Sequence, residues 1–187
     1  MKRIILGLFL LSQSLIATAQ DNYDVDLIPA NLRPRANAIV RNKETVVDMK
    51  AVDNVMLSVK QAITVFNKNG EDAARLVIFY DKNRVIKGIK GEVYNELGKP
   101  IGKFSQSDFK DESAGQDFSL FEDSRVKHYL PLVNTFPYTV VYNYEIRFKQ
   151  NLIIPQWRPV PGFDVSVQQS TYQFVSNPKD EVMLHKV

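Results

Sequence analysis

Acidic side chains gather in one part of the 187-residue chain, and they are the residues best suited to chemistry. Six lie within sixteen positions, namely Asp108, Asp111, Glu112, Asp117, Glu122 and Asp123. Carboxylate oxygens bind Ca²⁺, and a pair of carboxylates can hydrolyse a glycosidic bond. The spacing does not follow the D-x-[DN]-x-[DN]-G pattern of a calcium loop. Three interpretations stay open: a solvated surface loop over residues 108–123, which is the simplest, a cation site, and a small hydrolase that uses Asp111, Asp117 and Asp123.

The other metal-binding and nucleophilic residue types are scarce. His128 and His185 are the only histidines, they lie 57 positions apart, and the chain has no cysteine. A zinc site generally needs three or four ligands, so we interpret both histidines as ordinary strand residues. The lack of cysteine excludes thiol nucleophiles, thiolate metal sites and disulfides. No G-x-S-x-G elbow or Gly-rich phosphate loop occurs. We therefore expect no catalytic residue, no metal and no cofactor.

The first 19 residues have the parts of a secretory signal peptide. A basic pair, Lys2 and Arg3, precedes an apolar run over residues 4–11, and the segment ends with the small residues Ala17 and Ala19. This order predicts export and cleavage after Ala19. Because the apolar run is shorter than the roughly 20 residues that span a bilayer, we expect no transmembrane anchor.

The charge balance argues against a nucleic-acid partner. The chain has 24 basic and 21 acidic residues, and without residues 1–19 it has 22 basic and 21 acidic residues. Its basic residues are dispersed among the acidic ones, whereas nucleic-acid-binding proteins carry a strong basic patch. The remaining 168 residues suit a single domain, and a hydrophobic content of 44% is enough to build a core.

A strict two-residue alternation runs through the sequence "PYTVVYNYEIRFK" from Pro137 to Lys149. One parity is apolar: Tyr138, Val140, Tyr142, Tyr144, Ile146 and Phe148. The other is mostly polar: Thr139, Asn143, Glu145, Arg147 and Lys149. Successive side chains of a strand point to opposite faces, so the pattern predicts a long strand with one core face and one wet face. Residues 45–49 and 55–65 show the same alternation.

Turn signals separate about nine such segments. "AVDN" at residues 51–54 predicts a turn, and Asn69-Gly70 predicts a hairpin between the strand that ends at Phe66 and the next one. Gly88 and Gly91, inside a strand pattern, predict bulges or close backbone approach. The segment spacing, without helical periodicity, predicts an all-β fold, an antiparallel β-sandwich. Residues 20–36 form a lead-in segment, and residues 37–187 form the sandwich.

A proline-rich loop follows the long strand. The sequence "NLIIPQWRPVPG" places Ile153, Ile154 and the sole tryptophan, Trp157, among three prolines. Rigid apolar loop residues are typical of partner-binding surfaces. A simpler interpretation is that the loop folds over an open end of the sandwich and buries these side chains. If one surface is functional, we expect it at this loop and at Tyr142 and Tyr144 of the preceding strand.

Several of these stretches resemble a known family. "YDKNRVIKGIKGEVYNELGKPIGKF", "DFSLFEDSRVKHYLPLV" and "PYTVVYNYEIRF", together with "DLIPANL" and "IPQWRP", resemble the uncharacterised exported domain at the N-terminus of bacterial transglutaminase-like proteins in Gram-negative envelopes. The resemblance runs from about Tyr23 to Phe174. It implies an all-β accessory domain in the periplasm or cell envelope, with the chemistry in a separate Cys/His/Asp domain.

The chain departs from that family in one respect. Residues 1–187 contain no cysteine, so we expect no Cys/His/Asp domain here and carry over no catalytic residue, and the resemblance implies further strands beyond Val187. We therefore expect a sandwich that is incomplete at its C-terminus. The resulting hypothesis is a non-catalytic module that docks onto a protein partner, a transglutaminase-like or peptidase-type domain. Glycan binding through the Trp157 loop, or hydrolysis at the acidic loop, are the alternatives.

Overall fold

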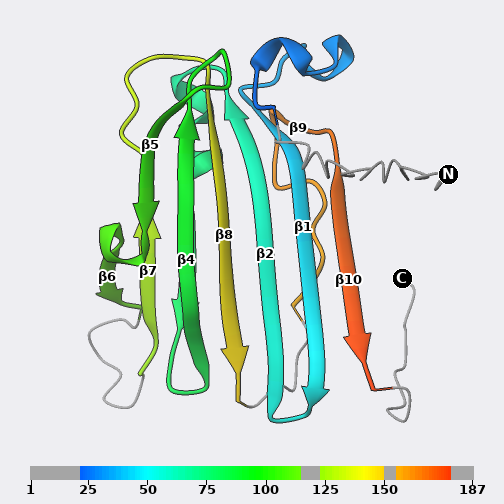
Figure 1. Cartoon of the computed structure of the whole chain (residues 1–187), viewed down its shortest axis with the longest axis vertical. Coiled ribbons are helices and arrows are strands. Elements are labelled where there is room, and N and C mark those ends of the chain that lie inside the picture. The colour runs from blue at the N-terminus through cyan, green and yellow to red at the C-terminus, as the bar shows by residue number, and fades with distance from the viewer. Residues whose placement is uncertain (1–21, 115–122, 150–154, 178–187) are drawn as a thin grey trace, which may run out of the picture.

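The computed structural model describes residues 22–114, 123–149 and 155–177. The described chain consists mainly of strands arranged in two sheets, which confirms the all-β fold class (Figure 1). The expected signal peptide, residues 1–19, lies outside the described residues. No helix in the described part is long and apolar enough to cross a membrane.

The larger sheet has seven strands. Their bounds are Ala38–Ala51 (β1), Asn54–Val65 (β2), Arg84–Tyr94 (β4), Pro100–Ser105 (β5), Tyr138–Phe148 (β8), Val165–Val167 (β9) and Ser170–Ser176 (β10). The strand order is β10-β1-β2-β8-β4-β5, and β9 pairs with the first residues of β1. The long strand predicted from the alternation is β8, and it lies at the centre of this sheet between β2 and β4.

The smaller sheet has three strands in the order β3-β7-β6. Their bounds are Leu76–Tyr80 (β3), Lys110–Ser113 (β6) and Arg125–Tyr129 (β7). Four short 3₁₀ helices complete the described structure: Val25–Leu27 (η1), Ala30–Leu32 (η2), Lys68–Ala74 (η3) and Gln106–Asp108 (η4).

Strand pairing is antiparallel except at β1, which pairs in parallel with both β9 and β10. The predicted antiparallel pairing therefore holds except at this edge of the sheet. Parallel neighbours need a long crossover connection, and the stretch of chain between β8 and β9 provides that length.

The turn and bulge predictions around β1, β2 and β4 are confirmed. β1 ends at Ala51 and β2 begins at Asn54, as "AVDN" indicated. In β4 the register with β8 shifts between Ile86 and Gly88. Gly91 permits close packing, because a Cβ atom there would lie 2.2 Å from the ring of Phe104.

The hairpin predicted at Asn69-Gly70 is wrong. Residues around this dipeptide form η3, and β2 pairs with β1 and β8 rather than with β3. The glycine serves a different purpose. A Cβ atom at Gly70 would lie 2.1 Å from the carbonyl oxygen of Asn37, so Gly70 lets η3 lie directly against the backbone that enters β1.

The core lies between the two sheets. It joins the apolar parity of β8, including Tyr138, Val140 and Ile146, to Leu76 and Ile78 of β3. Near β5 the core ends in a cluster of three aromatic rings. The ring of Tyr129 lies 4.5 Å from that of Phe104 and 5.3 Å from that of Phe109. We call the opposite side of the large sheet the outer face.

The lead-in segment covers one end of the outer face. Val25 and Ile28 pack on Ile39 of β1, and the ring of Tyr23 lies 4.7 Å from that of Tyr94 of β4. η1 and η2 lie across the end of the sheet where β2 finishes (Figure 1). The rest of the outer face is left open by the described residues.

Candidate binding groove on the outer face

Strand register fixes which side chains meet on the open part of the outer face. One row across the sheet pairs Glu44 with Lys60, Lys60 with Asn143, and Asn143 with Lys90. A second row pairs Ser58 with Glu145 and Glu145 with Gly88. Directly paired residues point to the same side, so charged and amide groups from four strands share this face.

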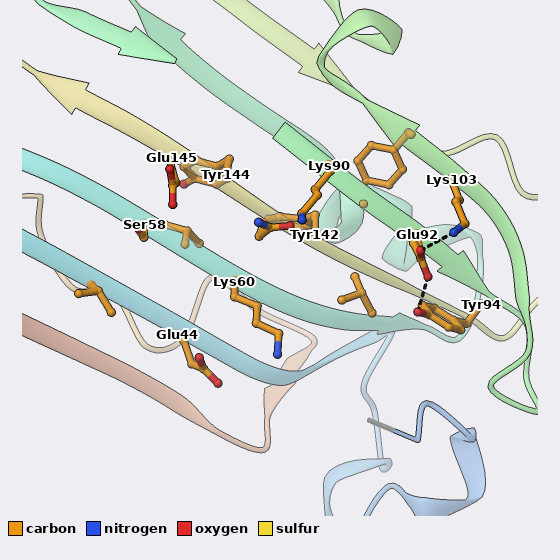
Figure 2. A pocket seen from close by; sticks show the side chains of 16 residues that line it. Glu44, Ser58, Lys60, Lys90, Glu92, Tyr94, Lys103, Tyr142, Tyr144 and Glu145 are labelled. Carbon is orange, nitrogen blue, oxygen red and sulfur yellow. Dashed lines mark hydrogen bonds and ion pairs between the residues drawn. The ribbon is translucent and has the colours of Figure 1, made fainter. Parts of the chain in front are cut away.

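A groove of about 630 Å³ lies over these rows (Figure 2). Its size falls in the range of ligand sites in proteins. The residues that line it on the outer face include Glu44, Ser58, Lys60, Lys90, Glu92, Tyr94, Lys103, Asn143 and Glu145. They come from β1, β2, β8, β4 and β5, so the groove crosses the strands.

Gly88 leaves a hollow beside the groove. Gly88, Lys90, Asn143 and Glu145 line a space of about 290 Å³ together with Ile89. A Cβ atom built at Gly88 would meet no heavy atom within 4 Å. The glycine is therefore not required by packing, and its missing side chain keeps this part of the outer face open.

The charges at the β5 side of the groove are satisfied within the chain. The Tyr94 hydroxyl donates to a Glu92 carboxylate oxygen at 2.6 Å, and Lys103 Nζ lies 3.0 Å from the other oxygen. Hydrogen bonds from Tyr94, and then from Lys103, lower the pKa of Glu92, so this carboxylate is ionised at neutral pH. Figure 2 draws both contacts as dashed lines. At the β1 side, Asn42 Nδ2 donates to Glu44 at 2.7 Å.

Two charged side chains in the groove have no such contact. Among the described residues, no side-chain hydrogen bond or ion pair engages Lys90 or Glu145, and both side chains are exposed. The side-chain amide of Asn143, which lies between them in the register, likewise has no hydrogen-bond partner in the described chain. Among its charged and amide groups, the groove thus presents the Lys90 cation, the Glu145 anion and the Asn143 amide without a side-chain partner in the described chain.

Tyr142 and Tyr144, expected at an interaction surface, have their side chains on the core face. Both alternate with Asn143, and Tyr142 belongs to the buried core. Their rings stack with centroids 6.3 Å apart. Burial raises the pKa of both phenols. Their strand therefore contributes to the groove through the residues between them.

The structure places Trp157 on the core side, away from the groove. Its Nε1 donates to Ser170 Oγ at 3.2 Å, and its ring centroid lies 6.5 Å from that of Tyr172 in β10. The Trp157 side chain is still 48% exposed, and Phe163 in the same loop is almost fully exposed. Ile153 and Ile154 lie outside the described residues, so the expected interaction surface is only partly visible.

The described part of the acidic segment is held by structural contacts. Asp111 accepts hydrogen bonds from the Tyr80 hydroxyl at 2.6 Å and Lys127 Nζ at 2.8 Å, and it pairs with Arg125 at 2.9 Å. Hydrogen bonding by Lys127, and then Tyr80, lowers the pKa of Asp111 to about 2. An acid of this strength is fully ionised at neutral pH and cannot serve as a general acid there.

The other described residues of the acidic segment, and His128, do not come together in one site. Asp108 caps η4 through the Ser105 backbone N–H, and Asp123 lies 3.7 Å from Lys82. His128 lies 3.4 Å from Glu112. In the described ranges no group of three or more histidine and acidic residues could hold a metal. Asp117, Glu122 and His185 lie outside those ranges.

Sequence reasoning missed Lys90 and Gly88 as groove residues. The polar parity of the long strand already indicated that Asn143 and Glu145 share a wet face. Lys90 joins them only because β4 pairs with β8 in one particular register, and the pattern of either strand alone does not determine that register. The sequence offered one indication, Gly88, because a glycine inside a strand pattern suggests a bulge or a place where another group approaches the backbone closely.

A family model described as a domain of unknown function with a solved structure, DUF3857, matches residues 55–186. The match covers well over half of the chain and includes the groove strands β2, β4, β5 and β8. The chain belongs to the DUF3857 family. The expectation of an uncharacterised β domain is thereby confirmed.

Solved structures share the fold of this DUF3857 chain, and 25 of their chains match it. One is the crystal structure of a putative protease from Parabacteroides distasonis, with a TM-score of 0.54 and 12% sequence identity. The likeness covers 62% of this chain and 24% of that one, so the DUF3857 chain spans about a quarter of that protein's length. No curated protein matches the chain.

Proposed function

We propose that this DUF3857 chain is a non-catalytic binding module, and that it docks onto a transglutaminase-like or peptidase-type domain in the periplasm or cell envelope. The observation that carries the proposal is the open groove on the outer face, where the exposed Lys90 and Glu145 lie beside the half-buried Asn143. Polar groups arranged in this way provide specificity for a partner.

One comparison supports a peptidase-type partner. The same fold makes up about a quarter of a larger chain that is named as a putative protease. A β domain that makes up part of a protein named as a protease is suited to hold the rest of such a protein in place. The sequence resemblance described above supports a transglutaminase-like domain as the other candidate partner.

A non-catalytic role fits the acidic residues of the described chain. Asp111, the acidic residue with the most contacts, is committed to Tyr80, Arg125 and Lys127. These contacts link β3, β6 and β7, so the carboxylate stabilises the small sheet. This favours docking over hydrolysis at the acidic segment.

The test is direct association. The purified chain is titrated with the transglutaminase-like and peptidase-type proteins encoded in the same genome, using calorimetry at 0.15 M salt. We expect saturable binding to at least one of them, with weaker binding as salt rises because charged groups line the groove. A chain that melts cooperatively yet associates with none of these proteins would contradict the proposal.

A further inference from the structure

Lys90 and Glu145 are diagonal neighbours on the outer face. Lys90 is directly opposite Asn143, and Glu145 lies two residues further along β8 on the same side of the sheet. Diagonal neighbours in a sheet are separated by about 7 Å. The groove therefore offers one positive and one negative group at a fixed spacing, and neither has a side-chain partner in the described chain.

An extended polypeptide has a matching spacing. Each residue of a strand advances by about 3.3 Å, so side chains two residues apart lie on one side about 6.6 Å from each other. An acidic and a basic side chain at such positions would face Lys90 and Glu145 together. A single small anion would satisfy Lys90 but would be repelled by Glu145.

Asn143 suits the main chain of such a peptide. It lies between the two charges, and its side-chain amide provides both donors and an acceptor. A peptide bond presents the complementary N–H and C=O groups. The hollow beside Gly88 gives the peptide room to approach the sheet, because no described atom lies within 4 Å of a Cβ built there.

The aromatic groups of this region disfavour a glycan. Sugar-binding surfaces rely on exposed rings, whereas Tyr142 and Tyr144 have their rings on the core face. Tyr94 is the aromatic residue of the groove with its ring on the outer face, and it packs on Tyr23 and donates to Glu92. The groove therefore offers charge and amide recognition instead of a stacking platform.

We propose that the groove on the outer face binds an extended polypeptide segment with an acidic and a basic side chain two residues apart, the first pairing with Lys90 and the second with Glu145. This inference rests on the proposed function, since the segment would belong to the partner domain.

Two glycine variants test whether the partner binds at the groove. Gly88→Leu fills the hollow beside the groove, while Gly102→Leu adds the same side chain to β5 outside it, and neither glycine has an atom within 4 Å of a built Cβ. We expect Gly88→Leu to weaken association with the partner about tenfold or more, as when a central contact is blocked, and Gly102→Leu to leave it unchanged. Thermal melts of both variants confirm that the fold is kept.

A charge exchange tests the chemistry. The wild-type chain and the double variant Lys90→Glu/Glu145→Lys are each used to select octapeptides from a random phage-displayed library. We expect the wild type to enrich peptides with opposite charges two positions apart, and the double variant to enrich the reverse order along the peptide. Peptides without paired charges, or the same order from both proteins, would overturn the inference.

The outcomes separate this inference from the proposed function. If the partner domain binds the Gly88→Leu chain as tightly as the wild type, docking stands and the groove is not its site. If paired-charge peptides are selected but no transglutaminase-like or peptidase-type protein binds, the groove inference stands and the partner class is wrong. Selection of aromatic or uniformly acidic peptides would also reject the paired-charge contact.

Discussion

Asp111 is the most densely bonded carboxylate in the described chain. It accepts from Tyr80 of β3 and pairs with Arg125 and Lys127 of β7, although it stands on β6. Its side chain is 31% exposed and that of Lys127 is 13% exposed. Partial burial shields these contacts from solvent more than an ordinary surface pair is shielded. One residue thus ties together all three strands of the small sheet.

The lowered pKa of Asp111 makes part of the stability pH-dependent. The pKa falls from 3.8 to about 2 in the folded chain, so the folded state favours the ionised carboxylate. The resulting stabilisation is complete above about pH 5 and is lost as the pH falls through about 4 to 2. We expect the stability gap between wild type and Asp111→Asn to be largest at neutral pH and to close near pH 2.

Chemical denaturation across pH 7 to 2 measures this gap. Asp53→Asn, in the exposed turn between β1 and β2, is the matched control and should leave the pH profile of wild type intact. A stability gap for Asp111→Asn that does not change between pH 7 and pH 2 would show that the charge of Asp111 contributes nothing.

Composition could identify the acidic residues but not their partners. Asp111 and Lys127 are sixteen positions apart, and they meet because β6 and β7 are paired in one particular register. The same limit applies to the groove. The alternation in β8 correctly separated Asn143 and Glu145 from the core tyrosines, yet Lys90 could be added only once β4 was placed beside β8.

β4 carries two glycines with opposite roles. A Cβ at Gly91 would lie 2.2 Å from the Phe104 ring, whereas Gly88 faces open space. Phe104 is buried, and its own neighbours Tyr129 and Phe109 leave it little freedom to move. The sequence indicated that both positions were special but could not distinguish a packing requirement from an open face.

Alanine at these two positions should separate the roles. We expect Gly91→Ala to lower the free energy of unfolding by about 1–3 kcal/mol, the usual cost of overpacking a core. Gly88→Ala should change it by no more than about 0.5 kcal/mol, as for other surface substitutions. Urea denaturation of both variants provides the comparison, and equal losses would mean that Phe104 moves aside without cost.

The missed hairpin at Asn69-Gly70 has the same physical origin. Asn69-Gly70 is a residue pair that accepts a tight turn, and this local property predicted the hairpin. In the structure, Gly70 instead packs against the backbone of Asn37, which is more than thirty positions away in the sequence. Long alternating strands such as β2 and β8 were predictable because each carries its own pattern. The parallel edge of the sheet was not, since it depends on where a long connection returns the chain.

The lead-in segment adds a third layer at one end of the molecule, on the outer face of the large sheet. It packs Ile28 against Ile39 of β1 and Tyr23 against Tyr94 of β4. Between these two contacts in the register lies the fully buried hydroxyl pair of Thr64 and Thr139, whose Oγ1 atoms are 2.8 Å apart. The Arg41 guanidinium donates to the Asp24 carbonyl oxygen and helps to fasten the segment. The sequence predicted a lead-in segment but not that it would cover the polar face of the sheet.

A pair of adjacent residues tests whether this segment is integral to the fold. Ile28 is 2% exposed and Leu27 is 56% exposed. We expect Ile28→Ala to lower the free energy of unfolding by about 2–5 kcal/mol through cavity formation, and Leu27→Ala to change it by no more than about 0.5 kcal/mol. Thermal and urea unfolding check both values, and a small effect at Ile28 would indicate a loosely attached segment.

The parallel pairing of β1 with β10 has a kinetic consequence. Lys43 of β1 is opposite Ser170, which is 127 positions later in the chain. Pairings between such distant residues raise the contact order, and domains dominated by them fold in milliseconds to seconds, slower than helical bundles. During synthesis, β1 can pair with β2 early, but it must wait for β9 and β10 until nearly the whole domain has emerged from the ribosome.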